Sequence, residues 1–161
     1  MGRKTGNTWD EKGRINIVYI FIHHAEEIDS IQFLYAEDGE LVLSDSYGNK
    51  RGKNFDFVKL DYPAEYITSI RGRLHCHDNS LRSITFETNH GEYGPFGKSY
   101  SSHKEFALRL GDGGHFGGFH GTADSRRLKS IGVYFEPITS YNLVDNNSVK
   151  METNDEKFDE C

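Results

Sequence analysis

A short pattern, Ile or Leu followed by any residue and then Ser-Ile, occurs four times and constrains the fold of this chain more than any other feature. The copies span residues 28–31, 67–70, 81–84 and 128–131. Those at 28, 81 and 128 start 53 and 47 residues apart, and each has another apolar residue two positions after its Ile. Alternate residues of a strand share one face of a sheet, and a repeated unit with one apolar face must stack against its copies. The repeat therefore predicts three small sheets around one axis.

The rest of the sequence also has the period of strands rather than of helices. Apolar side chains alternate along residues 15–21, 55–57, 106–110 and 131–135, and turn signals rich in Gly, Asn and Asp separate these stretches. No apolar spacing typical of a helix extends beyond about two turns. We therefore predict one all-β domain over residues 3–137. The polar and acidic residues 138–161 lack any period, so we expect them to form a disordered tail.

Charge and hydropathy exclude two classes of function. The formal net charge is −6 and the chain has no basic block, which argues against nucleic-acid binding by direct readout. The longest strongly apolar run covers residues 17–22, far short of the roughly 20 residues that a membrane-spanning helix needs. The N-terminus has no apolar stretch of the secretory type. We therefore expect no membrane partner and a cytoplasmic location that also allows the nucleus.

The sequence has no pattern that indicates catalysis. It contains no Gly-x-Ser-x-Gly nucleophile motif, and its glycine-rich segment at 111–118 lacks the Lys-Ser/Thr ending of a phosphate-binding loop. The histidine and cysteine side chains of residues 75–77 alternate between the two faces of a strand, so they do not converge on a metal. We therefore expect no enzyme activity, no cofactor and no metal site.

Six segments in one order resemble the jacalin-related plant lectins. They are residues 28–33, 62–72, 81–89, 93–97, 117–121 and 128–134. Trp9-Asp10 after Gly6 is similar to the N-terminal turn of that family, so the resemblance covers about residues 3–136. It implies a β-prism of three four-stranded Greek-key sheets with pseudo-threefold symmetry, in agreement with the repeat.

Within this family the chain looks closest to short single-domain members, some of which restrict plant RNA viruses. The resemblance implies a mannose-type carbohydrate-binding module in plant defence against viruses, with a glycan or glycoprotein as its partner. The alternative is a protein-interaction scaffold in antiviral resistance, with a viral or host protein as partner and a degenerate sugar site. Faces of such prisms often pair, so a homo-oligomer is also open.

The resemblance further implies a sugar site built from backbone amides and one carboxylate. In the family, an amide near the chain start and two amides of a late loop surround the sugar together with an aspartate. Here the first amide belongs to Gly6 and the late loop is residues 121–129. The family's loop glycine corresponds to Ser125, and its two amide donors correspond to Arg126 and Arg127. Preordered amides donate to sugar hydroxyls, and a carboxylate accepts from two hydroxyls.

The sequence departs from the family at the aspartate, which corresponds to Lys129. Lysine donates hydrogen bonds and accepts none, so it does not replace a carboxylate. Three outcomes stay open: Asp124 in the same loop substitutes and sugar binding is retained, neutral-sugar binding is lost, or the site has turned toward anionic groups. We expect the loop at residues 89–92, which includes Asn89, to line one wall of this site, with His90 or Glu92 able to touch the ligand.

Overall fold

The computed structural model describes residues 6–110 and 115–136, and its regular elements are β-strands. They are β1 (Asn7–Asp10), β2 (Ile17–His24), β3 (Ile28–Glu37), β4 (Glu40–Leu43), β5 (Tyr47–Gly48), β6 (Asn54–Lys59), β7 (Ile67–Leu74), β8 (Leu81–Thr88), β9 (Glu92–Gly97), β10 (Lys104–Arg109), β11 (His115–Ala123) and β12 (Leu128–Glu136). This part of the chain contains no helix with the length and hydropathy to cross a bilayer. The predicted boundary at residue 137 and the tail at 138–161 lie outside the described residues.

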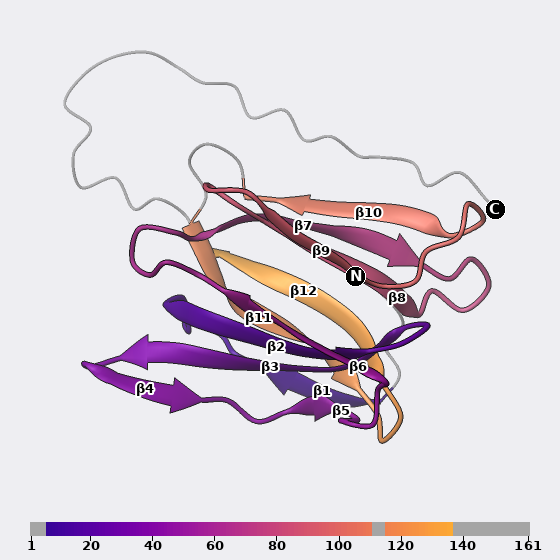
Figure 1. Ribbon diagram of the computed structural model, residues 1–161, viewed down its shortest axis with the longest axis horizontal. Coiled ribbons are helices and arrows are strands. Elements are labelled where there is room, and N and C mark those ends of the chain that lie inside the picture. The colour runs from indigo at the N-terminus through magenta and orange to yellow at the C-terminus, as the bar shows by residue number, and fades with distance from the viewer. Residues whose placement is uncertain (1–5, 111–114, 137–161) are drawn as a thin grey trace, which may run out of the picture.

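The strands form three antiparallel sheets around a shared interior (Figure 1). Their orders are β4-β3-β2-β6 with β5 also beside β3, β10-β7-β8-β9, and β1-β11-β12. In the first two sheets a later strand returns beside the first strand of a meander, which is Greek-key order. In the third sheet β1 takes that returning position beside β11. The three-sheet architecture is therefore confirmed, although within the described residues only one of the sheets has four strands.

The copies of the Ser-Ile pattern occupy equivalent places in the three sheets. Ile28, Leu81 and Leu128 are the first residues of β3, β8 and β12. Each of these strands forms a hairpin with the strand before it, and the register shifts next to the hairpin loop in all three sheets. The copy at residues 67–70 differs, because it begins β7, the earlier strand of its hairpin. The repeat therefore marks one structural position three times.

The interior is one cluster of buried side chains to which all three sheets contribute. β3, β8 and β12 contact one another pairwise, so the repeated strands line the centre. The ring of Phe119 lies 5.0 Å from that of Phe33 and 6.2 Å from that of Phe86, measured between centroids. All three rings are fully buried, and each such burial contributes roughly 1.5–3 kcal/mol to folding. The sheets therefore depend on one another for their apolar contacts.

The hairpins determine which loops lie at the same end of the molecule. β2, β7 and β11 lead into loops at residues 25–27, 75–80 and 124–127. These three loops lie on the right-hand side of Figure 1, while the turn between β3 and β4 lies on the left. We call the side with the three hairpin loops the loop end.

Candidate functional site

Gly6 lies against the late loop at the loop end. Its φ is +119°, and a Cβ there would come within 2.5 Å of the carbonyl oxygen of Ala123. The adjacent residue pairs with β11 in the register Asn7 to Ala123. Glycine adopts this φ without the steric cost of a side chain. The structure therefore brings the chain start and the late loop together, as the family resemblance implies.

Asp124 organises the late loop through its own carboxylate. Its Oδ1 accepts hydrogen bonds from the amides of Arg126 at 2.8 Å and Arg127 at 3.0 Å. Its amide in turn donates to the carbonyl oxygen of Arg127 at 3.0 Å. This is an Asx turn, which holds a short loop in one conformation. The two amides predicted to face a sugar are therefore engaged by a carboxylate of the same loop.

Lys129, on β12, also contacts the carboxylate of Asp124. Its ammonium lies 3.0 Å from Oδ2 of Asp124, and the lysine side chain is only 6% exposed. A buried ammonium needs such a partner because desolvation of an isolated charge is costly. Lys129, which the family resemblance aligns with an aspartate, therefore holds the carboxylate of Asp124 in place.

The contacts of Asp124 keep its carboxylate ionised. Partial burial raises its pKa, but hydrogen bonds from the Arg126 amide, the Lys129 ammonium and the Arg127 amide outweigh that effect and lower the pKa to about 2. The side chain stays 26% exposed. Asp124 is therefore a charged acceptor that a ligand at the loop end can reach.

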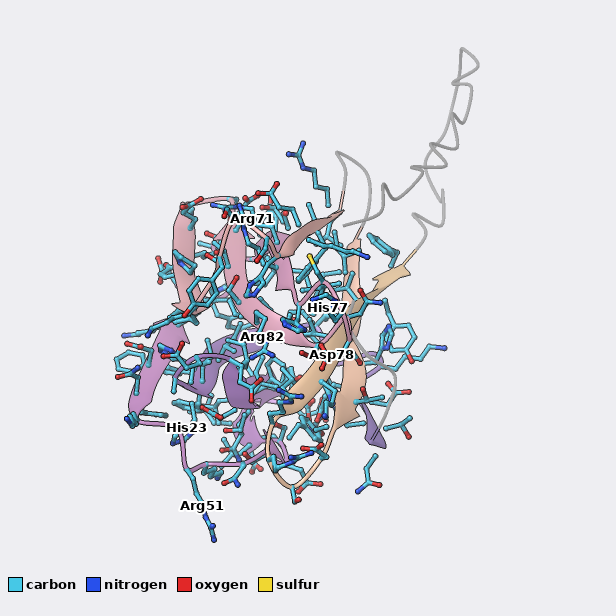
Figure 2. All side chains as sticks on the ribbon, turned by 90° about the vertical axis from the view of Figure 1, so that its right-hand side faces the viewer. His23, Arg51, Arg71, His77, Asp78 and Arg82 are labelled. Carbon is cyan, nitrogen blue, oxygen red and sulfur yellow. The ribbon has the colours of Figure 1, made fainter. Side chains whose placement is uncertain are left out.

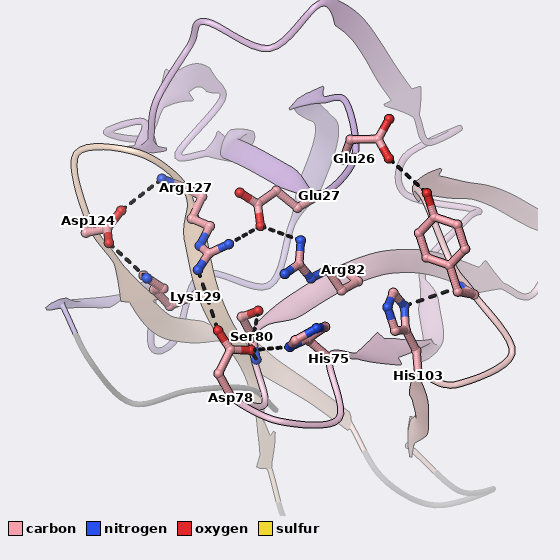
Figure 3. A network of polar contacts seen from close by, with 11 residues as sticks. Glu26, Glu27, His75, Asp78, Ser80, Arg82, His103, Asp124, Arg127 and Lys129 are labelled. Carbon is pink, nitrogen blue, oxygen red and sulfur yellow. Dashed lines mark hydrogen bonds and ion pairs between the residues drawn. The ribbon is translucent and has the colours of Figure 1, made fainter. Parts of the chain in front are cut away.

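A network of charged side chains joins the late loop to the other two hairpin loops (Figure 3). The guanidinium of Arg127 forms an ion pair with Glu27 of the first loop and lies 3.7 Å from Oδ2 of Asp78 in the second loop. Glu27 also accepts from Arg82 of β8 at 3.0 Å. Figure 2 views the molecule from this end and shows Arg82 and Asp78 near the middle and Arg51 at the rim. One guanidinium thus connects loops from all three sheets.

Asp78 is held by its own loop as well. Burial raises its pKa, but hydrogen bonds from Ser80 and His75 outweigh burial and hold the pKa well below its usual range. The rings of His75 and His77 have centroids 5.5 Å apart. Within residues 6–110 and 115–136, however, no group of three or more His, Cys, Asp or Glu is arranged to hold a metal ion.

The structure contradicts the predicted position of Asn89 and His90. β8 starts at the loop end and runs away from it, so the turn that follows Thr88 lies at the opposite end. There Asn89 accepts from the amide of Tyr66 and donates to the carbonyl oxygen of Ala64. His90 lies 3.8 Å from Glu65 at that same end. The loop that does adjoin Arg127 is residues 75–80.

Sequence reasoning also missed two charged residues that the repeat could have revealed. The second position of the pattern holds Asp29, Arg82 and Lys129 in β3, β8 and β12, so these three side chains occupy equivalent places. Burial raises the pKa of Asp29, and its buried Oδ2 has no hydrogen-bond partner. An alignment of these three copies shows that the second position of the pattern is charged in every sheet.

Comparison with known proteins agrees with this architecture. The family model described as "Jacalin-like lectin domain" matches residues 1–134. The chain belongs to the jacalin-like lectin family. The β-prism fold is thereby confirmed, since a mannose-binding lectin from Champedak superposes with a TM-score of 0.73 at 29% identity, covering 84% of this chain and 92% of that one. A mannose-binding jacalin-related lectin from Ananas comosus superposes with a TM-score of 0.71 at 31% identity, covering 84% and 93%.

Relatives of this jacalin-like lectin in Arabidopsis thaliana are more similar in sequence. The protein named RESTRICTED TEV MOVEMENT 1 is 46% identical over 142 residues, which are 85% of this chain and 82% of that protein. Jacalin-related lectin 3 is 41% identical over 145 residues, which are 88% of this chain and 24% of that longer protein. The chain thus matches most of RESTRICTED TEV MOVEMENT 1 and one part of a longer lectin.

Proposed function

We propose that this jacalin-like lectin is a non-catalytic carbohydrate-recognition module that limits the movement of viruses in plant cells. It would act in the cytoplasm, on a mannose-type glycan or a glycoprotein. Its 46% identity to RESTRICTED TEV MOVEMENT 1 supports the antiviral part, and the mannose-binding lectins with the same fold support the choice of sugar.

One observation carries the binding site of this proposal. Asp124, whose backbone amide lies near Gly6 where the chain start meets the late loop, presents an ionised, partly exposed carboxylate. An ionised carboxylate accepts hydrogen bonds from neighbouring sugar hydroxyls, and such charge-assisted bonds are roughly twice as strong as neutral ones. Asp124 would thus supply the acceptor that Lys129 does not.

A glycan array with the purified protein tests the proposal. We expect weak binding to mannose-type glycans, lost in Asp124→Asn but unchanged in the control Asn89→Ala, which lies at the opposite end. Binding to no glycan, or binding that Asp124→Asn leaves intact, would contradict a sugar site at this place.

The second candidate is a protein-interaction scaffold whose sugar site is degenerate. The engagement of the Arg126 and Arg127 amides by Asp124 favours it, because a sugar would have to compete with a carboxylate for these donors. Pull-down from infected tissue separates the two candidates. Partners retained in excess free mannose support the scaffold, whereas partners released by the sugar support the lectin.

A further inference from the structure

The outward face of the sheet β4-β3-β2-β6 is apolar, although an antiparallel sheet that faces water usually presents polar side chains there. We call this surface the apolar face. It comprises Tyr19, Phe21, Leu41, Leu43, Phe55 and Phe57. The two leucines, Phe55 and Phe57 are 54 to 65% exposed. Contiguous apolar patches on a protein surface mark contacts with other proteins or with membranes.

The side chains of the apolar face form one continuous surface. The ring of Tyr19 has its centroid 5.6 Å from that of Phe21 and 5.9 Å from that of Phe57. The surface continues across Leu34 of β3, which is opposite Tyr19 on one side and Leu43 on the other. The half on β6 and β2 is therefore aromatic, and the half on β3 and β4 is aliphatic.

The two other sheets provide an internal comparison, because the pseudo-threefold symmetry relates their strands to these. When the sheets are aligned on the Ser-Ile pattern, Ala107 of β10 and Asp10 of β1 have the position of Phe57. Arg71 of β7 has the position of Phe21 and forms two ion pairs there. The fold does not require rings at these positions, so their presence on one sheet indicates a contact that this sheet makes.

Cations lie along the aromatic half of the apolar face. Among the outward-facing side chains of β2, β3, β4 and β6, only Lys59 on β6 carries a formal charge at neutral pH. The segment that leads into β6 adds Lys50, Arg51 and Lys53, all exposed. Lys50 donates to Gln32 at 3.2 Å, and Figure 2 shows Arg51 extending outward at the rim. The apolar face thus has a cationic margin at β6.

Acidic side chains lie at the other margin. Asp38 and Asp45 flank β4 in sequence, Glu40 begins this strand, and all three are exposed. β4 and β6 are the two edges of the sheet order β4-β3-β2-β6, so the width of the face separates the charges of opposite sign. An anionic partner therefore approaches the aromatic half at β6.

We propose that the apolar face docks this protein on the surface of an anionic lipid bilayer, which the protein does not cross. The rings and leucines enter the boundary between headgroups and acyl chains, where burial of apolar area drives such binding. Lys59 and the cations of residues 50–53 meet the anionic headgroups. The expectation of no membrane partner concerned segments that span a bilayer, and a surface that lies on a bilayer needs no such segment.

The aliphatic half of the face favours lipid over a single-stranded nucleic acid. Bases stack on aromatic rings and phosphates pair with cations, so a nucleic acid would use only the half on β6 and β2. Leu41 and Leu43, at 65% and 56% exposure, would stay in water. A bilayer buries the leucines and the rings together, and it therefore accounts for the whole face.

The size of the face determines how strong this docking is. Four strands about 4.8 Å apart and side chains spaced about 6.6 Å along each strand give a face of roughly 400 Å². A small apolar contribution gives only marginal, reversible membrane binding, as a single acyl chain does, and stable anchoring takes a second signal. Here the cations are the second signal, so binding depends on anionic lipid and weakens as salt screens the charges.

Sedimentation of the full chain with lipid vesicles tests this inference. We expect reversible binding to vesicles of phosphatidylcholine with phosphatidylserine, and roughly tenfold weaker binding to phosphatidylcholine alone. Phe57→Glu should weaken binding by about tenfold or more, because it places a charge among the lipids, whereas Phe57→Trp should retain it, because tryptophan suits the membrane interface. Ala107→Glu is the matched control and should leave binding unchanged, because Ala107 has the equivalent position on β10 and receives the same charge.

Exchange of cations tests the electrostatic part of the docking. Lys53→Gln combined with Lys59→Gln should weaken binding to the anionic vesicles and reduce its dependence on salt. Lys104→Gln combined with Arg109→Gln should leave binding unchanged, since these control residues begin and end β10 of another sheet. Leu43→Glu, on the aliphatic half, gives a second apolar disruption. Far-UV circular dichroism checks that each variant is folded.

Three results would overturn the proposal. A chain that binds neither kind of vesicle has no lipid contact of this type. Binding that survives both Phe57→Glu and Leu43→Glu uses another surface. A chain that binds single-stranded oligouridine instead of vesicles, with binding lost in Phe57→Glu, assigns the aromatic half to a nucleic acid.

Discussion

Lys129 and Asp124 form an ion pair that fixes the conformation of the late loop. Lys129 is nearly buried and points its ammonium at Asp124, whose other oxygen accepts from two loop amides. A buried cation is tolerated only with such a partner. The carboxylate that accepts hydrogen bonds in this loop therefore belongs to Asp124, a residue of the loop itself.

The pH dependence of the free energy of unfolding should report on the ion pair between Asp124 and Lys129. The pKa of Asp124 is lowered from its ordinary value of 3.8 to about 2, so its contribution to stability is present above about pH 4 and is lost as the pH falls toward 2. After allowance for its partial exposure we expect roughly 1 kcal/mol. Asp124→Asn should flatten the dependence of the free energy of unfolding on pH in that window, measured by denaturant titration.

The same variant should also cost stability at neutral pH, by about 2 kcal/mol, because it leaves the Lys129 ammonium buried without a counterion. Adding Lys129→Met removes that charge, so the double variant should recover most of the loss. Equal pH slopes in wild type and Asp124→Asn, or a double variant no more stable than the single one, would contradict this account.

Gly6 can be tested against a second glycine that shares its backbone region. Gly6→Ala should destabilise the fold by roughly 2–4 kcal/mol, because its positive φ is combined with a Cβ that would lie 2.5 Å from the carbonyl oxygen of Ala123. Gly13 also has a positive φ but nothing within 4 Å, so Gly13→Ala should cost only about 1 kcal/mol. Thermal unfolding measures both. Equal costs would mean that the approach to Ala123 contributes nothing.

At the scale of the elements, the three hairpin loops of the loop end are connected, because Arg127 contacts loops from the other two sheets. Its ion pair with Glu27 and its approach to Asp78 connect three hairpins that are far apart in sequence. Ion pairs at partly buried positions are screened less than exposed ones. The conformation of any one hairpin loop therefore depends on the others.

Hydrogen exchange should detect this dependence. Arg127→Met should speed amide exchange in residues 25–27 and 75–80, because both loops lose a charged partner, and should cost about 2 kcal/mol of stability. Arg126→Met is the control, since the exposed Arg126 meets Asp124 only through its backbone amide. Faster exchange confined to residues 124–127 would show that the loops are independent.

The strands were predictable from sequence, but their directions in space were less so. Alternation and the Ser-Ile copies at 28, 81 and 128 located three equivalent strands, because period two and repetition are local properties. The position of Asn89 depends on whether a turn leads into or out of such a strand, which periodicity does not reveal. The contacts of Asp124 depend on the backbone of a four-residue loop, and the sequence alone left three outcomes open there.

At the scale of the whole molecule, the three sheets share one interior, with Phe33, Phe86 and Phe119 in contact across them. No sheet buries its inner face without the other two. A three-sheet body of this kind should unfold in one cooperative transition. The only tryptophan, Trp9, is nearly buried on β1 and stacks on Tyr47 at 4.4 Å between ring centroids, so it reports on the contact between two of the sheets.

A cavity made in the sheet β10-β7-β8-β9 should therefore change the unfolding that Trp9 reports from another sheet. Ile84 of β8 is fully buried, and Ile84→Ala should cost roughly 2–5 kcal/mol by removing apolar contacts. In denaturant titrations the midpoints from Trp9 fluorescence and from far-UV circular dichroism should shift together by the same amount. The exposed control Thr8→Ala, on the same strand as Trp9, should leave both midpoints nearly unchanged. If the circular dichroism midpoint falls while the Trp9 fluorescence midpoint does not change, the sheets unfold separately. The shared core would then not make unfolding cooperative.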